Sequence, residues 1–204
     1  NQQRIEGGMT ALCEALANDL GEVVRLGNPV TKVTHGDTAV VTLASGETVE
    51  ARTVVSTLPP RLAVALEYDP PLPQWRRDVA EKVAPGNVIK AYLVYETPFW
   101  RERGLSGQSS SDEGAVRVTF DTTPADSTRG LLMGFFEGNE ADSLAHRSLE
   151  TRRRAFVESA VRVFGVDAAE SVEYLERDWS AEQYTRGCHG AHFAPGIWTS
   201  NGPV

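Results

Sequence analysis

Cys188 is the residue best suited to a chemical role, because it lies in a loop that is rich in glycine and aromatic residues. Gly187 and Gly190 flank it and would let the backbone approach a flat ligand closely. Arg186 and His189 would favour the thiolate, which is the reactive form of the sulfur. The pattern indicates a contact with a cofactor. The alternative is a free cysteine that serves only as a small buried hydrophobic residue.

Lys90 is the second candidate, since it lies within residues 87–95, an apolar stretch typical of a β-strand. Burial lowers the pKa of a lysine, and a neutral amine in a closed site can hold a water molecule or accept a proton. The alternative is a strand lysine whose ammonium group reaches solvent while its stem packs on the sheet. The sequence pattern alone leaves both interpretations open.

A metal site is a third possibility near the cysteine. Cys188, His189 and His192 are residue types that bind zinc. On a strand, however, His189 and His192 would point to opposite faces, and no fourth ligand is close in the sequence. We therefore expect no metal.

The composition is that of a globular, acidic chain. Its 204 residues include 20 Lys and Arg against 28 Asp and Glu, a formal net charge of -8, which makes nucleic acid an unsuitable partner. Cys13 and Cys188 form no CxxC pair and are typical of a reducing compartment. No apolar run approaches the ~20 residues of a membrane span, and the N-terminus resembles no signal peptide. We expect a cytoplasmic protein with no nucleic-acid partner and no membrane segment in this chain.

The elements that must position these residues belong to a mixed α+β or α/β fold. Apolar periodicity predicts helices over residues 9–20, 74–83 and 149–164. Short β-branched runs between glycine turns predict an antiparallel meander over residues 23–26, 30–34, 39–43 and 48–55. The continuous apolar run at residues 53–60 predicts a buried strand that ends at a proline stop. Further strands are predicted at residues 87–95, 115–120, 131–137 and 173–179.

Several phrases of the sequence together resemble the flavin-containing amine oxidases, the monoamine oxidase group. They follow the family's order at close to its spacing, over nearly all 204 residues, and the phrases around Lys90 and Cys188 are the most specific. The phrases are Gly7-Gly8 before a helix, Pro29-Val30, residues 53–60, Pro70-Pro71-Leu72-Pro73, Gly86-Asn87-Val88-Ile89-Lys90, Thr97-Pro98-Phe99-Trp100, Asp178-Trp179 and residues 184–190.

This resemblance implies FAD as the cofactor and a role for each matched position. Lys90 matches the lysine that holds a water against flavin N5. Cys188 matches the cysteine that bonds to the flavin 8α-methyl carbon in the monoamine oxidase branch, although some relatives hold FAD without that bond. Val30 matches a residue at the adenine end of FAD, while Trp179 and Tyr184 match aromatic residues beside the isoalloxazine.

The resemblance also implies where the substrate binds. Val118, Phe120 and Phe135 fall where the family lines its substrate cavity. His189 stands where monoamine oxidases usually carry a tyrosine of an aromatic cage. Because an imidazole adds a titratable edge, we expect a shift towards polar or diamine substrates. Arg117 is a candidate to bind a carboxylate, which would mark an amino-acid oxidase.

The reaction implied is oxidation of an amine to an imine and then an aldehyde, with oxygen reduced to hydrogen peroxide. FAD supplies the redox chemistry of this reaction. The alternatives are an amino-acid or polyamine oxidase of the same superfamily, and a non-catalytic binding module. The resemblance also allows a homodimer.

The resemblance implies a division of the chain as well. Residues 1–79 would belong to an FAD-binding domain, residues 80–181 to a substrate domain with a mixed or antiparallel sheet packed with helices, and residues 182–204 would return to the FAD domain. The chain contains no GxGxxG motif. The family's N-terminal dinucleotide-binding unit and C-terminal flavin segment would lie outside it, so we expect an internal part of a longer enzyme that is inactive alone.

Overall fold

The computed structural model describes residue 5 and residues 7–201, without the side chains of His189, Trp198 and Asn201. Within that range the chain forms two compact units. One unit holds the described residues up to Leu58 together with Ala63–Gln74, and the other holds Pro59–Leu62 and the described residues from Trp75 onward. The assignment of residues 1–79 and 80–181 to an FAD domain and a substrate domain stays a prediction.

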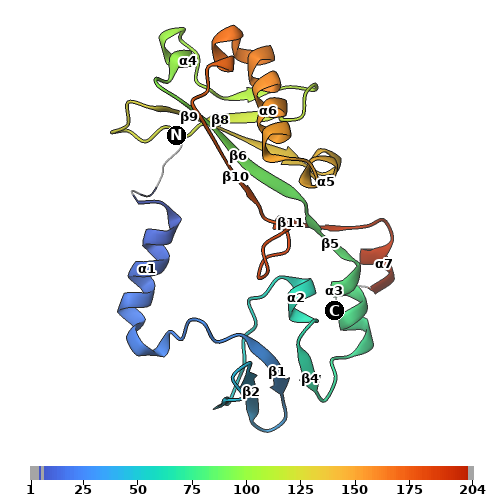
Figure 1. Cartoon of the computed structure of the whole chain (residues 1–204). Coiled ribbons are helices and arrows are strands. Elements are labelled where there is room, and N and C mark those ends of the chain that lie inside the picture. The colour runs from blue at the N-terminus through green and yellow to red at the C-terminus, as the bar shows by residue number, and fades with distance from the viewer. Residues whose placement is uncertain (1–4, 6, 202–204) are drawn as a thin grey trace. The chain divides into compact units, whose positions relative to one another are not determined.

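The first unit is built on a small sheet with the order β3-β2-β1-β4 (Figure 1). The strands β1 (Val30–Thr34), β2 (Ala39–Leu43) and β3 (Thr48–Ala51) form the predicted antiparallel meander, and β4 (Glu67–Asp69) pairs with β1 in parallel. Val33, Ala39 and Leu43 are its buried apolar residues. The helix α1 (Met9–Leu20) occupies the predicted residues and runs into a short 3-10 turn, η1 (Gly21–Val23).

Two predicted strands of this region are wrong. Residues 23–26 follow the helix and turn between Gly21 and Gly27, whose positive φ angles of 64° and 70° redirect the backbone at both ends. The run at residues 53–60 finds no strand partner in the described part of the chain, and Val55 is 81% exposed. A continuous apolar run becomes a buried strand only where other elements supply its backbone hydrogen bonds and cover both faces.

The second unit contains a five-stranded antiparallel sheet with the order β10-β6-β9-β8-β7. The strands are β6 (Val88–Tyr95), β7 (Ser109–Ser110), β8 (Val118–Asp121), β9 (Gly130–Glu137) and β10 (Glu173–Asp178). The long helix α6 (Leu149–Phe164) lies over one face of this sheet, as Figure 1 shows. The predicted helix at residues 149–164 and the mixed α/β class are confirmed.

The remaining elements of this unit are short. A two-stranded sheet pairs β5 (Val83–Gly86) with β11 (Cys188–Phe193). The helices are α2 (Pro60–Ala63), α3 (Gln74–Lys82), α4 (Phe99–Glu102), α5 (Asn139–Ala145), η2 (Val166–Ala169) and α7 (Ile197–Asn201).

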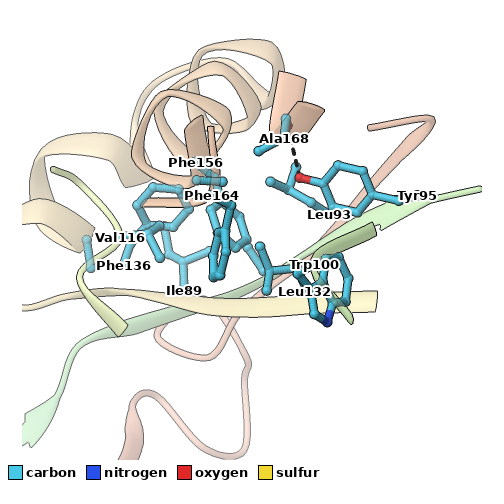
Figure 2. Packing of buried hydrophobic residues seen from close by; sticks show 13 residues of the cluster. Ile89, Leu93, Tyr95, Trp100, Val116, Leu132, Phe136, Phe156, Phe164 and Ala168 are labelled. Atoms are coloured by element: carbon cyan, nitrogen blue, oxygen red, sulfur yellow. Dashed lines mark hydrogen bonds between the residues drawn. The ribbon is translucent and has the colours of Figure 1, made fainter. Parts of the chain in front are cut away.

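The hydrophobic core of this unit lies between the sheet and α6 (Figure 2). Phe136 of β9 and Phe156 of α6 are fully buried, and their rings meet edge to face at 6.3 Å. Gly134 lets the helix approach closely, since a β-carbon there would lie 2.4 Å from Val116 Cγ1 and 2.7 Å from Phe156 Cζ. Because α6 packs against one face of the sheet, the alternate residues of each strand are left for the opposite face.

Candidate active site

The strand pleat places Lys90 and the predicted substrate-lining residues on the same face of the sheet. In β6 the residues Ile89, Ala91 and Leu93 belong to the core beside α6, so Lys90 faces the opposite side. Lys90 lies opposite Phe135 in the register of β6 and β9.

The aromatic residues of this face contact one another. The rings of Phe120 and Phe135 meet edge to face at a centroid separation of 6.4 Å. Val118 lies two positions before Phe120 on β8 and therefore shares its face. We call this set of residues the open sheet face: Lys90, Val118, Phe120 and Phe135. It presents one amine beside an apolar, aromatic surface.

Lys90 is half-buried, which is compatible with both interpretations of the sequence. Its Nζ lies 5.5 Å from the centroid of the Tyr92 ring, and such a ring face attracts a cation. Its neighbour on β10 is Arg177, an exposed residue whose guanidinium is 2.8 Å from Glu182. The amine of Lys90 therefore has an aromatic partner, while the nearby cation of Arg177 is already paired.

Cys188 is the first residue of β11, so its predicted place within a loop is wrong: the loop ends at Gly187 and residues 188–193 form a strand. The loop ends at Gly187 because β11 begins to pair with β5 at this point, with Cys188 opposite Gly86. From Gly86 the backbone continues into β6 and reaches Lys90 four residues later, a span of about 13 Å for extended chain. One continuous segment therefore positions both candidate cofactor contacts.

The loop that precedes Cys188, residues 179–187, is closed on itself by hydrogen bonds. Gly187 N donates to Trp179 O at 3.0 Å, and Thr185 Oγ1 donates to the same oxygen at 3.0 Å. Trp179 N in turn donates to Val88 O of β6 at 3.3 Å. Both predicted aromatic residues lie in this loop, which we call the cysteine loop. Trp179 is half-buried and Tyr184 is 59% exposed.

For two of the predicted site residues the structure gives no position relative to this site. Val30 is half-buried at the start of β1, opposite Leu43, and belongs to the other compact unit. The side chain of His189 lies outside the described part of the chain. Their predicted contacts with the cofactor and the substrate stay predictions.

Metal and membrane chemistry find no support in the part of the chain that is described. Among the described side chains, which do not include that of His189, no group of three His, Cys, Asp or Glu is arranged to hold a metal ion. None of the helices described here is long and apolar enough to cross a membrane.

Arg117, the candidate carboxylate ligand, lines a pocket of ≈ 240 Å³ beside Phe135. The other lining residues are Ala115, Glu137, Asn139 and Glu140. Arg117 lies 3.9 Å from Glu140, and Glu137 has no ion-pair partner among the described residues. With two carboxylates against one guanidinium, the pocket carries a net negative charge when all three groups are ionised.

The sequence did not single out Asn87, which lies between β5 and β6. Its Oδ1 accepts a hydrogen bond of 2.5 Å from Ser180 Oγ in the cysteine loop, and its Nδ2 donates to Asp142 Oδ1 on α5. These partners are 93 and 55 residues away in the sequence, so only its place just before the Lys90 strand could have drawn attention to it.

Known structures share this arrangement of elements. The wild-type putrescine oxidase solved with bound putrescine is 38% identical and superposes with a TM-score of 0.89 over 94% of this chain and 43% of that one. The cyclohexylamine oxidase from Brevibacterium oxydans IH-35A is 26% identical, with a TM-score of 0.86 over 93% of this chain and 42% of that one. The fold is thus shared with a class of proteins whose solved members include oxidases of amines.

The sequence comparisons place the chain within a particular family. Residues 1–198 match the family described as flavin containing amine oxidoreductase, and the chain belongs to it. AofH of Mycobacterium tuberculosis is 38% identical over 98% of this chain and 44% of its own length. Amine oxidase [flavin-containing] B of Homo sapiens is 35% identical over 100% of this chain and 40% of its own length. The chain therefore spans less than half of the curated relatives that it matches.

Proposed function

We propose that this chain forms part of an FAD-dependent amine oxidase. The enzyme oxidises an amine to an imine while oxygen is reduced to hydrogen peroxide, and water hydrolyses the imine to an aldehyde with release of ammonia or an amine. The observation that supports this most is the placement of Lys90 with Val118, Phe120 and Phe135 on the open sheet face. Because the chain spans less than half of its relatives, the proposal concerns the longer enzyme. We expect the 204 residues alone to be inactive.

The described side chains fit the redox ring of a flavin. A thiol and an amine, both half-buried, extend from one backbone segment and its strand partner, and the ring of Tyr184 is left largely uncovered. We propose that Cys188, Trp179 and Tyr184 hold the isoalloxazine end and Val30 the adenine end, with a thioether to Cys188 as the finer proposal. When bound, FAD would accept a hydrogen equivalent from the carbon next to the amine nitrogen and pass the electrons to oxygen.

The residues of the open sheet face would prepare the substrate and a water molecule. Phe120 and Phe135 form an apolar wall, and a poorly hydrated site beside it would favour the neutral amine over the ammonium ion. Lys90 would hold a water molecule on its Nζ at the edge of this wall. In these roles the residues of the open sheet face would bind and orient the reactants and limit their contact with water.

A diamine or polyamine substrate is the second candidate, and the pocket beside Phe135 supports it. Its net negative charge would attract a second ammonium group, and the carboxylate of Glu137 is available to pair with one. An amino-acid substrate is less suited, since Arg117 already has Glu140 as a partner and a substrate carboxylate would meet two like charges.

The test uses the full-length polypeptide that contains this chain. It is purified, its absorption spectrum is recorded, and it is denatured to see whether yellow colour stays with the protein. Peroxide formation is then measured with a monoamine, a diamine and an amino acid. Flavin in the native protein together with peroxide from an amine supports the proposal. A colourless protein that gains no activity with added FAD contradicts it and favours the binding module.

Three finer proposals need separate measurements. Colour that remains after denaturation and is lost in Cys188→Ser would support the thioether. Gel filtration would test a homodimer, and cell fractionation would test a cytoplasmic location.

A further inference from the structure

We propose that Asn87 is a positioning residue, which fixes the cysteine loop relative to the strand that carries Lys90. Its effect on catalysis rests on the function proposed above, whereas its effect on the loop does not. The residue directly follows Gly86, the strand partner of Cys188, on the backbone segment that leads to Lys90.

The side chain of Asn87 joins three segments of the unit. On one side its Oδ1 accepts the hydrogen bond from Ser180 Oγ at 2.5 Å, the residue that follows Trp179 in the cysteine loop. On the other side its Nδ2 donates to Asp142 of α5, while its backbone oxygen accepts from Gly138 N at 3.0 Å, just before the same helix. Asn87 is therefore held from α5 and in turn holds the loop.

Apart from the Asn87 link, the hydrogen bonds of the loop within the described part of the chain are internal or reach the adjoining end of β10, where Glu182 pairs with Arg177 at 2.8 Å, and one backbone bond reaches β6. Gly187 and Thr185 both bond to Trp179 O, and Asp178 Oδ1 accepts from the backbone of Ser180 at 2.9 Å. The bond from Trp179 N to Val88 O connects the loop to β6 but is longer, at 3.3 Å. Loss of the Asn87 link would free the loop to shift as a unit, and Cys188 at its end would move with it.

An amide is the group that this position requires. Ser180 Oγ needs an acceptor, and the ionised carboxylate of Asp142 accepts but cannot donate. Asn87 supplies both functions, and this pairing also determines which side-chain atom is oxygen and which is nitrogen. An aspartate at position 87 would still accept from Ser180, but it would place a second carboxylate against Asp142.

The experiment exchanges the two groups in the full-length protein. The variants are Asn87→Asp, Asp142→Asn and the double variant with both changes, and Asn18→Asp on the exposed surface of α1 is the control for added charge. In the double variant the amide and the carboxylate change places, so the hydrogen bond between positions 87 and 142 can form again with reversed polarity. All of these changes keep side-chain size, so they avoid the cavity that Asn87→Ala would leave.

Hydrogen exchange of the backbone amides of residues 179–188 is the first measurement, because it needs no activity. We expect Asn87→Asp to raise their exchange about tenfold, because repulsion between the new carboxylate at position 87 and Asp142 would displace the side chain at position 87 and with it the acceptor of Ser180 Oγ. The double variant should return it to within about twofold of the parent protein, and Asn18→Asp should leave it unchanged. Equal exchange in the parent and Asn87→Asp, or no recovery in the double variant, overturns the proposal.

Steady-state kinetics is the second measurement. A misplaced loop should lower kcat about tenfold with little change in KM, because the amine binds on the open sheet face and not on the loop. Recovery of kcat in the double variant supports positioning, and an unchanged kcat in Asn87→Asp contradicts it. If the parent protein neither binds flavin nor oxidises amines, the proposed function fails while the exchange experiment still decides the role of Asn87.

Discussion

Gly187 lies against Pro85 with no room for a side chain. A β-carbon on Gly187 would lie 2.5 Å from Pro85 Cβ and 3.1 Å from Gly86 O, and Gly187 has a φ of 152°, which side chains rarely allow. This close approach lets the cysteine loop end where β11 begins its pairing with β5. Gly187 therefore helps to determine that β11 begins at Cys188.

Gly187→Ala should displace Cys188 and reduce flavin retention. The backbone strain alone is on the order of 1–3 kcal/mol, and the contact with Pro85 adds to it. We expect the full-length variant to retain at most about a tenth of the bound flavin of the parent protein, measured by absorbance after purification at matched concentration.

Gly190→Ala is the matched control on the other side of Cys188. Gly190 has no positive φ of the restrictive kind, and a β-carbon there would meet only His192 Nε2, at an ordinary 3.5 Å. It should keep most of the flavin. Equal flavin content in the two variants would show that the glycine at position 187 does not place the cysteine.

Lys90→Met should lower turnover with an amine by about 100-fold, the lower range for loss of a group that handles a proton or a bound water. Methionine keeps an unbranched apolar side chain beside Tyr92, one atom shorter than lysine, and removes the nitrogen. Peroxide formation and the rate of flavin bleaching under anaerobic conditions separate the two halves of the reaction. Lys82→Met, at an exposed lysine of α3, controls for loss of positive charge, and an equal effect of both changes would contradict a role for Lys90 in the site.

The elements with strong local signals were predictable from the sequence. The helix α6 occupies the predicted residues 149–164, because a full apolar stripe and the Ser148 cap at its start act within the segment itself. The run at residues 53–60 carried an equally apolar signal but is exposed, because burial of a strand depends on neighbours that the run does not encode.

The candidate site was predictable only in part. Alternation along β6 identifies the residues that share a face with Lys90, but the sequence does not show that Phe135 lies opposite it, since register arises from pairing between distant strands. The same limit hid Asn87, whose partner Ser180 is 93 residues away. The reach of a side chain across the fold carries no local sequence signal.

Glu137→Gln should separate diamine from monoamine substrates. If the pocket beside Phe135 holds a second ammonium group, loss of the carboxylate charge removes a charge-assisted hydrogen bond worth about 1–3 kcal/mol. KM for a diamine should rise at least about fivefold while KM for a monoamine of equal length stays within twofold. Glu113→Gln, at an exposed glutamate outside the pocket, is the control. A parallel change for both amines would remove the pocket from substrate recognition.

Asp121→Asn should destabilise the sheet at neutral pH but not in acid. Burial by itself would raise the pKa of Asp121, but hydrogen bonds from Arg101 at 2.6 Å and Trp100 Nε1 at 2.9 Å, with those from Thr123, hold it below its ordinary value. A carboxylate whose pKa is lower in the folded state stabilises the protein above its unfolded pKa of about 4, and this contribution is lost as the pH falls further. At pH 7 we expect a cost of about 1–3 kcal/mol for the charge-assisted bonds.

The pH dependence can be measured by hydrogen exchange of β8 and β9 in the full-length protein, with rates corrected for the intrinsic effect of pH. The difference between Asp121→Asn and the parent should be largest at pH 7 and should shrink as the pH falls below about 4. Asp126→Asn, at an exposed carboxylate in the connection between β8 and β9, should show no such difference at either pH. A difference for Asp121→Asn that stays constant from pH 7 to about 3 would mean that shape, and not the charge of the carboxylate, holds Trp100 and Arg101 in place.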